Sequence, residues 1–194
     1  MRVHLAFGIL FLAGFAGSIA AAPVRKAKPT PSPTVSPSTS GTASAASSAA
    51  CSAPPYRQFD FWLGEWDIVG ADGKKTGDDK VVPILGGCAL QETWTGTKSG
   101  QGMSVSAYDP ATRRWHQMLV DDSGAVLKLE GEFADGKMVL IGRRPSQKEK
   151  GVTIVHRIAW TPTPDHRVHQ QWEASTNEGR TWRPVSDSTY VPRQ

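Results

Sequence analysis

The stretch that decides the fold is FDFWLGEWDI, at residues 59–68. It places two tryptophans and two phenylalanines around a Gly-x-Trp step, directly before a strand-like segment. A glycine permits a sharp backbone turn there, and a tryptophan two residues later can lay its indole across one end of a barrel. The residues predicted to pack at this closed end are Phe59, Phe61, Trp62, Gly64 and Trp66.

The residues from 55 to 194 are predicted to form one all-β domain. Turn signals recur along it, and the short runs between them are rich in Val, Ile, Thr and Trp, as in antiparallel sandwiches and barrels. From Ala125 to Phe133 apolar and charged side chains alternate, so one face is core and the other water. A short helical turn is expected within residues 56–63. We predict an antiparallel, calycin-like (lipocalin-like) β-barrel of roughly eight to ten strands.

The chain before this domain divides into two segments. Residues 1–22 have a basic start, a short apolar run and a small-residue end, which is typical of a secretory signal peptide. Residues 23–54 are mostly Pro, Ser, Thr and Ala, which predicts a disordered linker. No later run is long and apolar enough to suggest a membrane span. We therefore expect a secreted or periplasmic protein.

The positive charge of the chain belongs largely to these first segments. The net +4 is 22 Lys+Arg against 18 Asp+Glu. Four of the basic residues precede residue 55, where no acidic residue occurs, so residues 55–194 carry 18 of each sign. A neutral domain does not predict nucleic-acid binding. We expect a monomer.

Two cysteines, Cys51 and Cys88, lie in the exported part. In an oxidising compartment two cysteines most simply pair, and a bridge would fasten the end of the linker to the barrel wall. Two free thiols are the alternative.

Several motifs of the domain resemble those of an uncharacterised family of bacterial secreted domains that open with FDFWLGEWD. More distantly, the domain is similar to the lipocalin-like calycin barrels. The resemblance implies a barrel but no established activity. The motifs that carry it are residues 59–67, 84–88, 92–94 and 115–117, Asp121 with Gly124, Arg157 with Trp160, residues 168–170 and 172–173, and Gly179 with residues 181–182. The chain departs from the family pattern at Leu119 and His169.

Aromatic and polar side chains that share strand parity predict a ligand site in the barrel lumen. Such sites combine apolar walls with a few polar groups that orient a small hydrophobic or amphipathic ligand. The predicted ligand-binding residues are Glu92, Trp94, Trp115, Gln117, His156, Gln170 and Trp172. The alternative is a barrel filled by its own side chains, serving as an envelope interaction module. An exposed aromatic patch would favour that module.

An enzyme and a haem-binding barrel remain open alternatives. Catalysis would use lumen carboxylates, for which the candidates are Glu92, Asp121 and Glu173. Ser104 and Ser106 lack catalytic partners at motif spacing. Haem would need an axial histidine, for which His156 has the right parity. No metal site and no cofactor are predicted.

Residues 175–182 resemble an Asp-box hairpin of sialidases. One copy cannot build a propeller, which repeats this kind of unit in several blades. We expect a structural turn that places Trp182 against the adjoining strand.

Overall fold

The computed structural model describes residues 51–98 and 100–193. The predicted signal peptide and all but the last residues of the predicted linker lie outside these ranges. Three short 3-10 helices are present, η1 (Pro54–Arg57), η2 (Asp60–Trp62) and η3 (Leu85–Gly87). The strands are β1 (Gly64–Gly70), β2 (Lys75–Ile84), β3 (Ala89–Gly96), β4 (Gln101–Asp109), β5 (Arg114–Asp121), β6 (Val126–Ala134), β7 (Lys137–Pro145), β8 (Thr153–Pro162), β9 (Val168–Ser175) and β10 (Arg183–Pro192).

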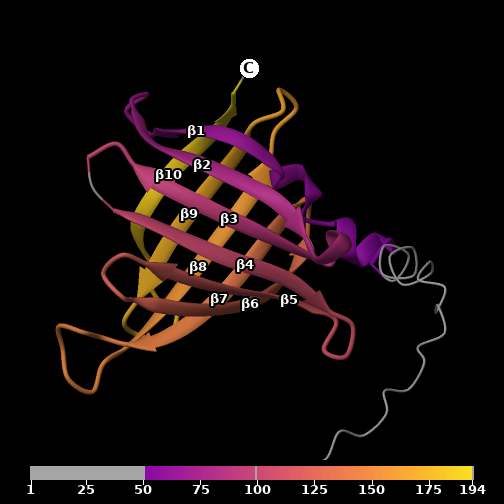
Figure 1. Cartoon of the computed structure of the whole chain (residues 1–194). Helices are drawn as coiled ribbons and strands as arrows, with labels where there is room; N and C mark the ends of the chain where they lie inside the picture. Colours follow the sequence, from indigo (N-terminus) through magenta and orange to yellow (C-terminus); the bar gives the residue numbers. More distant parts are fainter. Residues whose placement is uncertain (1–50, 99, 194) are drawn as a thin grey trace, which may run out of the picture. The chain divides into compact units, whose positions relative to one another are not determined.

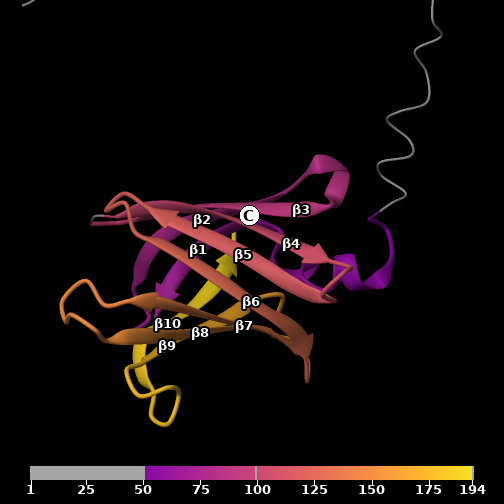
Figure 2. The same cartoon turned by 90° about the horizontal axis from the view of Figure 1, so that it is seen from below.

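These ten strands form one closed antiparallel barrel, which confirms the predicted all-β barrel. Each strand pairs with the next in sequence, and β1 pairs with both β2 and β10 to close the ring. Figure 2 shows β2–β4 and β7–β9 as opposite walls. Closure leaves no unpaired strand edge, so every strand has a hydrogen-bonded neighbour on both sides.

The side chains alternate between lumen and solvent as the sequence pattern predicts. On β6, Leu127 and Leu129 are buried, whereas Lys128 and Glu130 are exposed. Leu129 faces Gly142 of β7 in the cross-strand register. The apolar core therefore lies inside the barrel.

The segment that opens the domain closes one end of the barrel. Phe59 stacks on Trp62, with ring centroids 4.9 Å apart, and meets Trp115 and Trp160 edge-on at 5.6 and 5.2 Å. The purple helical turns lie at the right-hand end of the barrel in Figure 1. We call Phe59, Trp62, Trp115 and Trp160 the floor cluster.

Gly64 and Trp66 lock this floor to the first strand. Gly64 has φ +146°, and a Cβ at that position would lie 3.3 Å from the Trp66 indole. Another residue would therefore be strained there. Trp66 Nε1 donates a hydrogen bond to the Trp62 carbonyl oxygen at 3.0 Å, so a buried indole N–H is satisfied.

Cys51 and Cys88 form a disulfide, which confirms the predicted pairing. Cys88 follows η3 and precedes β3, so the bridge joins the wall to Cys51, which lies three residues before the start of η1. Arg57 of η1 also donates a hydrogen bond to the Gly87 carbonyl oxygen. In the described ranges, no helix is long and apolar enough to cross a membrane.

Candidate ligand-binding cavity

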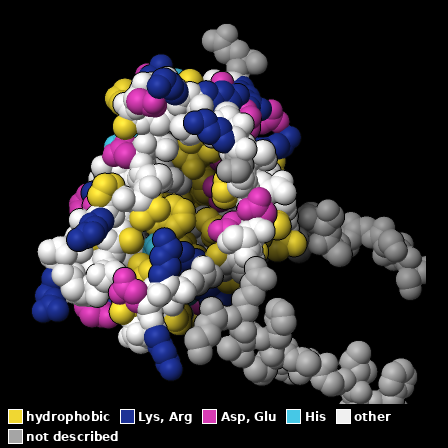
Figure 3. All heavy atoms as spheres, turned by 90° about the vertical axis from the view of Figure 1, so that its left-hand side faces the viewer, with side chains coloured by type: hydrophobic (Ala, Val, Ile, Leu, Met, Phe, Trp, Pro, Cys, Tyr) yellow, Lys and Arg dark blue, Asp and Glu magenta, His cyan; other side chains and the backbone are white. Residues whose placement is uncertain are grey.

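A cavity of about 310 Å³ lies inside the barrel. Figure 3 looks at the end opposite the floor cluster and shows a hollow with hydrophobic side chains inside it. The residues that line the cavity are Ile68, Glu92, Trp94, Leu119, Asp121, Ile158, Trp160, Gln170, Trp172, Val185, Ser186, Ser188 and Tyr190.

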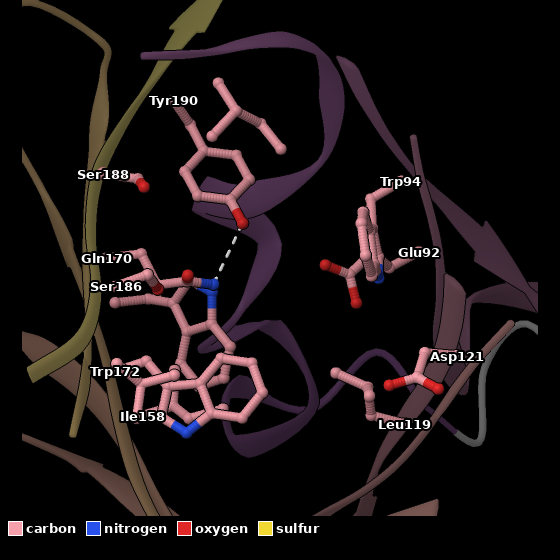
Figure 4. A pocket seen from close by; sticks show the side chains of 13 residues that line it. Glu92, Trp94, Leu119, Asp121, Ile158, Gln170, Trp172, Ser186, Ser188 and Tyr190 are labelled. Atoms are coloured by element: carbon pink, nitrogen blue, oxygen red, sulfur yellow. Dashed lines mark hydrogen bonds between the residues drawn. The ribbon is translucent and has the colours of Figure 1, made fainter. Parts of the chain in front are cut away.

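Two half-buried indoles form opposite walls of this cavity. Trp94 stands on β3 and Trp172 on β9, and Figure 4 shows them on opposite sides of the open space. Leu119 and Ile158 add aliphatic surface between them. A flat apolar molecule can therefore contact ring faces on both sides.

Gln170 and Tyr190 supply a fixed polar pair on one wall. Gln170 Nε2 donates a hydrogen bond to the Tyr190 hydroxyl oxygen at 2.9 Å (Figure 4). Burial raises the pKa of Tyr190 well above its usual value, so the phenol stays neutral and keeps its proton as a donor.

Glu92 faces the cavity from the other wall and ends a chain of hydrogen bonds. Gln117 Nε2 donates to Ser104 Oγ and to Ser106 Oγ, both at 3.1 Å. Ser104 Oγ donates in turn to Glu92 Oε2 at 2.5 Å. In the described part of the chain no hydrogen bond reaches Glu92 Oε1, and Figure 4 shows the carboxyl group turned toward the open space. One carboxyl oxygen is thus fixed by the protein and the other is available.

Asp79 is a second interior carboxyl group, and the sequence reasoning missed it. It is 2% exposed, and neither of its oxygens has a hydrogen-bond partner among the described residues. Burial first, and then the charge of Glu92, raise the pKa of Asp79 to about 9. Burial raises the pKa of Glu92 to about 7, against the hydrogen bond from Ser104. Near neutral pH the pair therefore carries at most about one negative charge.

The alternation of β2 could have revealed Asp79, because Gly77, Asp79 and Val81 share the inward parity. The prediction that Glu173 is a lumen carboxylate was wrong, and the alternation along β9 explains why. Glu173 follows the inward Trp172, so it faces outward, where it accepts hydrogen bonds from Arg157 at 2.7 and 3.0 Å. Two residues adjacent in a strand cannot both enter the lumen.

His156 lies on the lumen-facing side of β8, the same side as Ile158 and Trp160. Its Nδ1 accepts a hydrogen bond from Trp172 Nε1 at 3.0 Å. Burial, and then the nearby positive charge of Arg144, lower the pKa of His156 to about 4, so the ring is neutral at pH 7. His156 therefore holds the orientation of Trp172 and does not itself line the cavity.

The structure separates the predicted ligand-binding residues into three groups. Glu92, Trp94, Gln170 and Trp172 line the cavity. Trp115 belongs to the floor cluster, where its indole donates to Gln58 at 3.2 Å. Gln117 and His156 do not line the cavity but bind groups connected with it. Gln117 donates a hydrogen bond to Ser104, which binds Glu92, and His156 accepts one from Trp172. The lining residues missed from the sequence include Tyr190 and two serines of β10.

The hairpin at residues 175–182 is built as a structural turn. Ser175 Oγ accepts hydrogen bonds from the backbone N–H groups of Asn177 and Gly179. Arg157 of β8 lies 4.2 Å from the Trp182 ring centroid, so the indole packs on the outer wall. Within residues 51–98 and 100–193 there is no group of three or more His, Cys, Asp or Glu side chains that could hold a metal ion.

The buried carboxyl pair predicts an unusual dependence of stability on pH. A carboxyl group whose folded pKa is raised stabilises the fold fully below its unfolded pKa, and this contribution is lost as pH rises toward the folded pKa. We expect the free energy of unfolding to fall between pH 4 and pH 9. Asp79→Asn should flatten this fall by roughly 1–3 kcal/mol, as measured by urea unfolding at a series of pH values.

The control for this experiment is Asp122→Asn, at an exposed turn position, which should leave the pH profile unchanged. A wild-type stability that is constant from pH 4 to pH 9 would contradict the raised pKa values.

Comparison with known proteins adds no family to this description: no family model matches the chain, and no curated protein matches it significantly.

Proposed function

We propose that this protein binds a small, partly apolar molecule inside the barrel. The observation that carries the proposal is the cavity of about 310 Å³, which has indoles on opposite walls and few polar groups. Its volume is at the lower end of the range of small-molecule sites, about 300–1,000 Å³. A barrel filled by its own side chains would leave no such space.

The polar groups of the cavity support orientation of the bound molecule. Glu92 on β3 and the Gln170–Tyr190 pair on β9 and β10 lie on different walls and are buried. A ligand that left these groups without hydrogen bonds would be disfavoured, because buried polar groups are costly when unpaired. The cavity therefore favours amphipathic over purely hydrocarbon ligands.

Three alternatives fit the described residues less well. An interaction module would expose aromatic side chains, but the large exposed hydrophobic residues of the described ranges are aliphatic or Met. An enzyme would use the two carboxylates that line the cavity, Glu92 and Asp121, but Asp121 Oδ1 is already held by Ser123 and the Ala125 backbone N–H. If His156 bound haem iron, it would have to use its buried Nε2, since Nδ1 already accepts a hydrogen bond from Trp172 Nε1.

We further propose that binding takes place outside the cytoplasm, in a monomeric protein of the FDFWLGEWD type. The Cys51–Cys88 disulfide supports the location outside the cytoplasm, because such bonds persist in oxidising compartments.

A filled lumen should abolish binding. The neutral probe N-phenyl-1-naphthylamine is expected to bind the wild-type chain at one saturable site, with increased fluorescence. Ser188→Phe places a ring in the cavity and should raise the dissociation constant at least about tenfold. Thr189→Phe, one residue along β10 on the outer face, is the matched control.

Equal affinity of the probe for Ser188→Phe and Thr189→Phe would contradict a lumen site. Native mass spectrometry of protein purified from its own host supplies the second readout, in which a bound small molecule should be present on the wild-type chain and absent from Ser188→Phe.

A further inference from the structure

The charged side chains that line the cavity are all acidic. Its lining contains two acidic residues, Glu92 and Asp121, and no Lys, Arg or His. Asp121 already has partners, because its Oδ1 accepts hydrogen bonds from Ser123 and from the Ala125 backbone N–H. Glu92 is 5% exposed and has one hydrogen-bond donor, Ser104. Glu92 is therefore the buried acid of the cavity, and its Oε1 keeps an open hydrogen-bonding position.

We propose that the ligand is a protonated amine on a flat apolar body, with the Glu92 carboxylate as its counter-ion. This inference rests on the proposed function, since it names the ligand class of the same cavity. The ammonium group would take the hydrogen-bonding position left open at Glu92 Oε1, and the body would lie between Trp94 and Trp172 (Figure 4). Indole faces attract cations as well as apolar rings, so both parts of the ligand are accommodated.

The surroundings of Glu92 explain why an added cation is favourable. A buried carboxylate is destabilised unless a positive charge or hydrogen bonds compensate for lost hydration. The groups that face Glu92 or act on it are Asp79 on β2, Ser104 on β4 and Tyr190 on β10, and none of them carries a positive charge. Of these two carboxyl groups only Glu92 lines the cavity, so a ligand meets the negative charge of the pair at Glu92.

The main alternative to an amine is an anionic ligand, which Arg144 would attract. Arg144 has inward parity on β7, and its charge acts on Asp121 and His156. Arg144 does not line the cavity, and the pKa of Glu92 is shifted by burial and by Ser104, not by Arg144. A carboxylate ligand inside the cavity would meet Glu92 without a cation, which favours the amine.

The test uses three ligands that share one ring system and differ in the head group. Tryptamine, tryptophol and indole-3-acetate would each compete with N-phenyl-1-naphthylamine on the wild-type chain at pH 8. Tryptamine should bind at least about tenfold more tightly than tryptophol, as expected for a hydrogen bond between charged groups. Indole-3-acetate should bind most weakly of the three.

Glu92→Gln keeps the shape of the side chain and its acceptor for Ser104 but removes the charge, so tryptamine should lose its advantage over tryptophol. Glu132→Gln, on the exposed face of β6, is the matched control and should keep it. A second readout needs no variant: tryptamine affinity should fall with decreasing pH below about 7, approaching tenfold per pH unit, while tryptophol affinity stays constant.

Equal binding of tryptamine and tryptophol, tighter binding of indole-3-acetate, or an amine preference that survives Glu92→Gln would each overturn the amine proposal. Binding of the neutral probe in those cases leaves the proposed lumen function standing. Failure of the probe itself to bind at the Ser188 site would overturn both.

Discussion

Trp62→Ala is expected to lower the free energy of unfolding by about 3–5 kcal/mol, the usual cost of removing a fully buried aromatic side chain. Trp62 is 0% exposed. Its ring stacks on Phe59 at 4.9 Å and contacts Trp160 at 5.2 Å and Tyr190 at 6.2 Å. Because these partners come from the residue before η2, from β8 and from β10, the cavity left by alanine cannot close by moving one element.

The measurement is guanidinium unfolding followed by circular dichroism, so that the loss of a fluorescent residue does not affect the signal. Trp182→Ala is the control, since that indole lies half-buried on the outer wall against Arg157. It should cost about 1 kcal/mol, the contribution of an exposed cation–π contact. Similar losses for the two variants would contradict the assignment of Trp62 to the floor cluster.

Replacing both Cys51 and Cys88 by Ser is expected to cost about 3–4 kcal/mol, the chain-entropy value for a loop of this length. The cysteines are 37 residues apart in sequence, and the loop between them contains η1, η2, β1, β2 and η3. Without the bridge, the unfolded chain gains freedom and the helical turns of the floor lose one attachment to the wall. The hydrogen bonds from Arg57 to Gly87 and from Trp115 to Gln58 remain.

This prediction is checked by comparing the double variant with the oxidised wild-type chain in urea, and the wild-type chain with and without reductant. The reduced wild-type chain should resemble the double variant. Affinity for N-phenyl-1-naphthylamine should change little in the folded double variant, because the disulfide does not line the cavity. An unchanged midpoint of unfolding would show that the bridge does not stabilise the domain.

Much of the fold follows from local sequence patterns. Alternation along β6 predicted which side chains face the lumen, and Gly64 with Trp66 predicted a plugged end. The disulfide followed from having two cysteines in a chain that the sequence predicts to be exported. These features depend on residues that are close in sequence or on simple pairing, so no knowledge of the strand order was needed.

The candidate site was predictable only in part. Parity placed Trp94, Trp115 and Trp172 inside, yet Trp115 belongs to the floor and the other two line the cavity. Parity gives the face of a strand but not the height along the barrel axis, which depends on the stagger between paired strands. Asp79 was within reach of the same parity rule, whereas its interaction with Glu92 required the register of β2 against β3.

Local sequence patterns therefore predict an all-β chain with a tryptophan-plugged end, one disulfide and a set of inward polar residues. Only the tertiary structure decided which of these residues meet one another: a carboxyl pair on adjacent strands, two indoles on opposite walls and a space between them. The reason is physical. Side-chain direction is set locally by the pleat of each strand, but cavities and shared charges arise from the closure of ten strands into one ring.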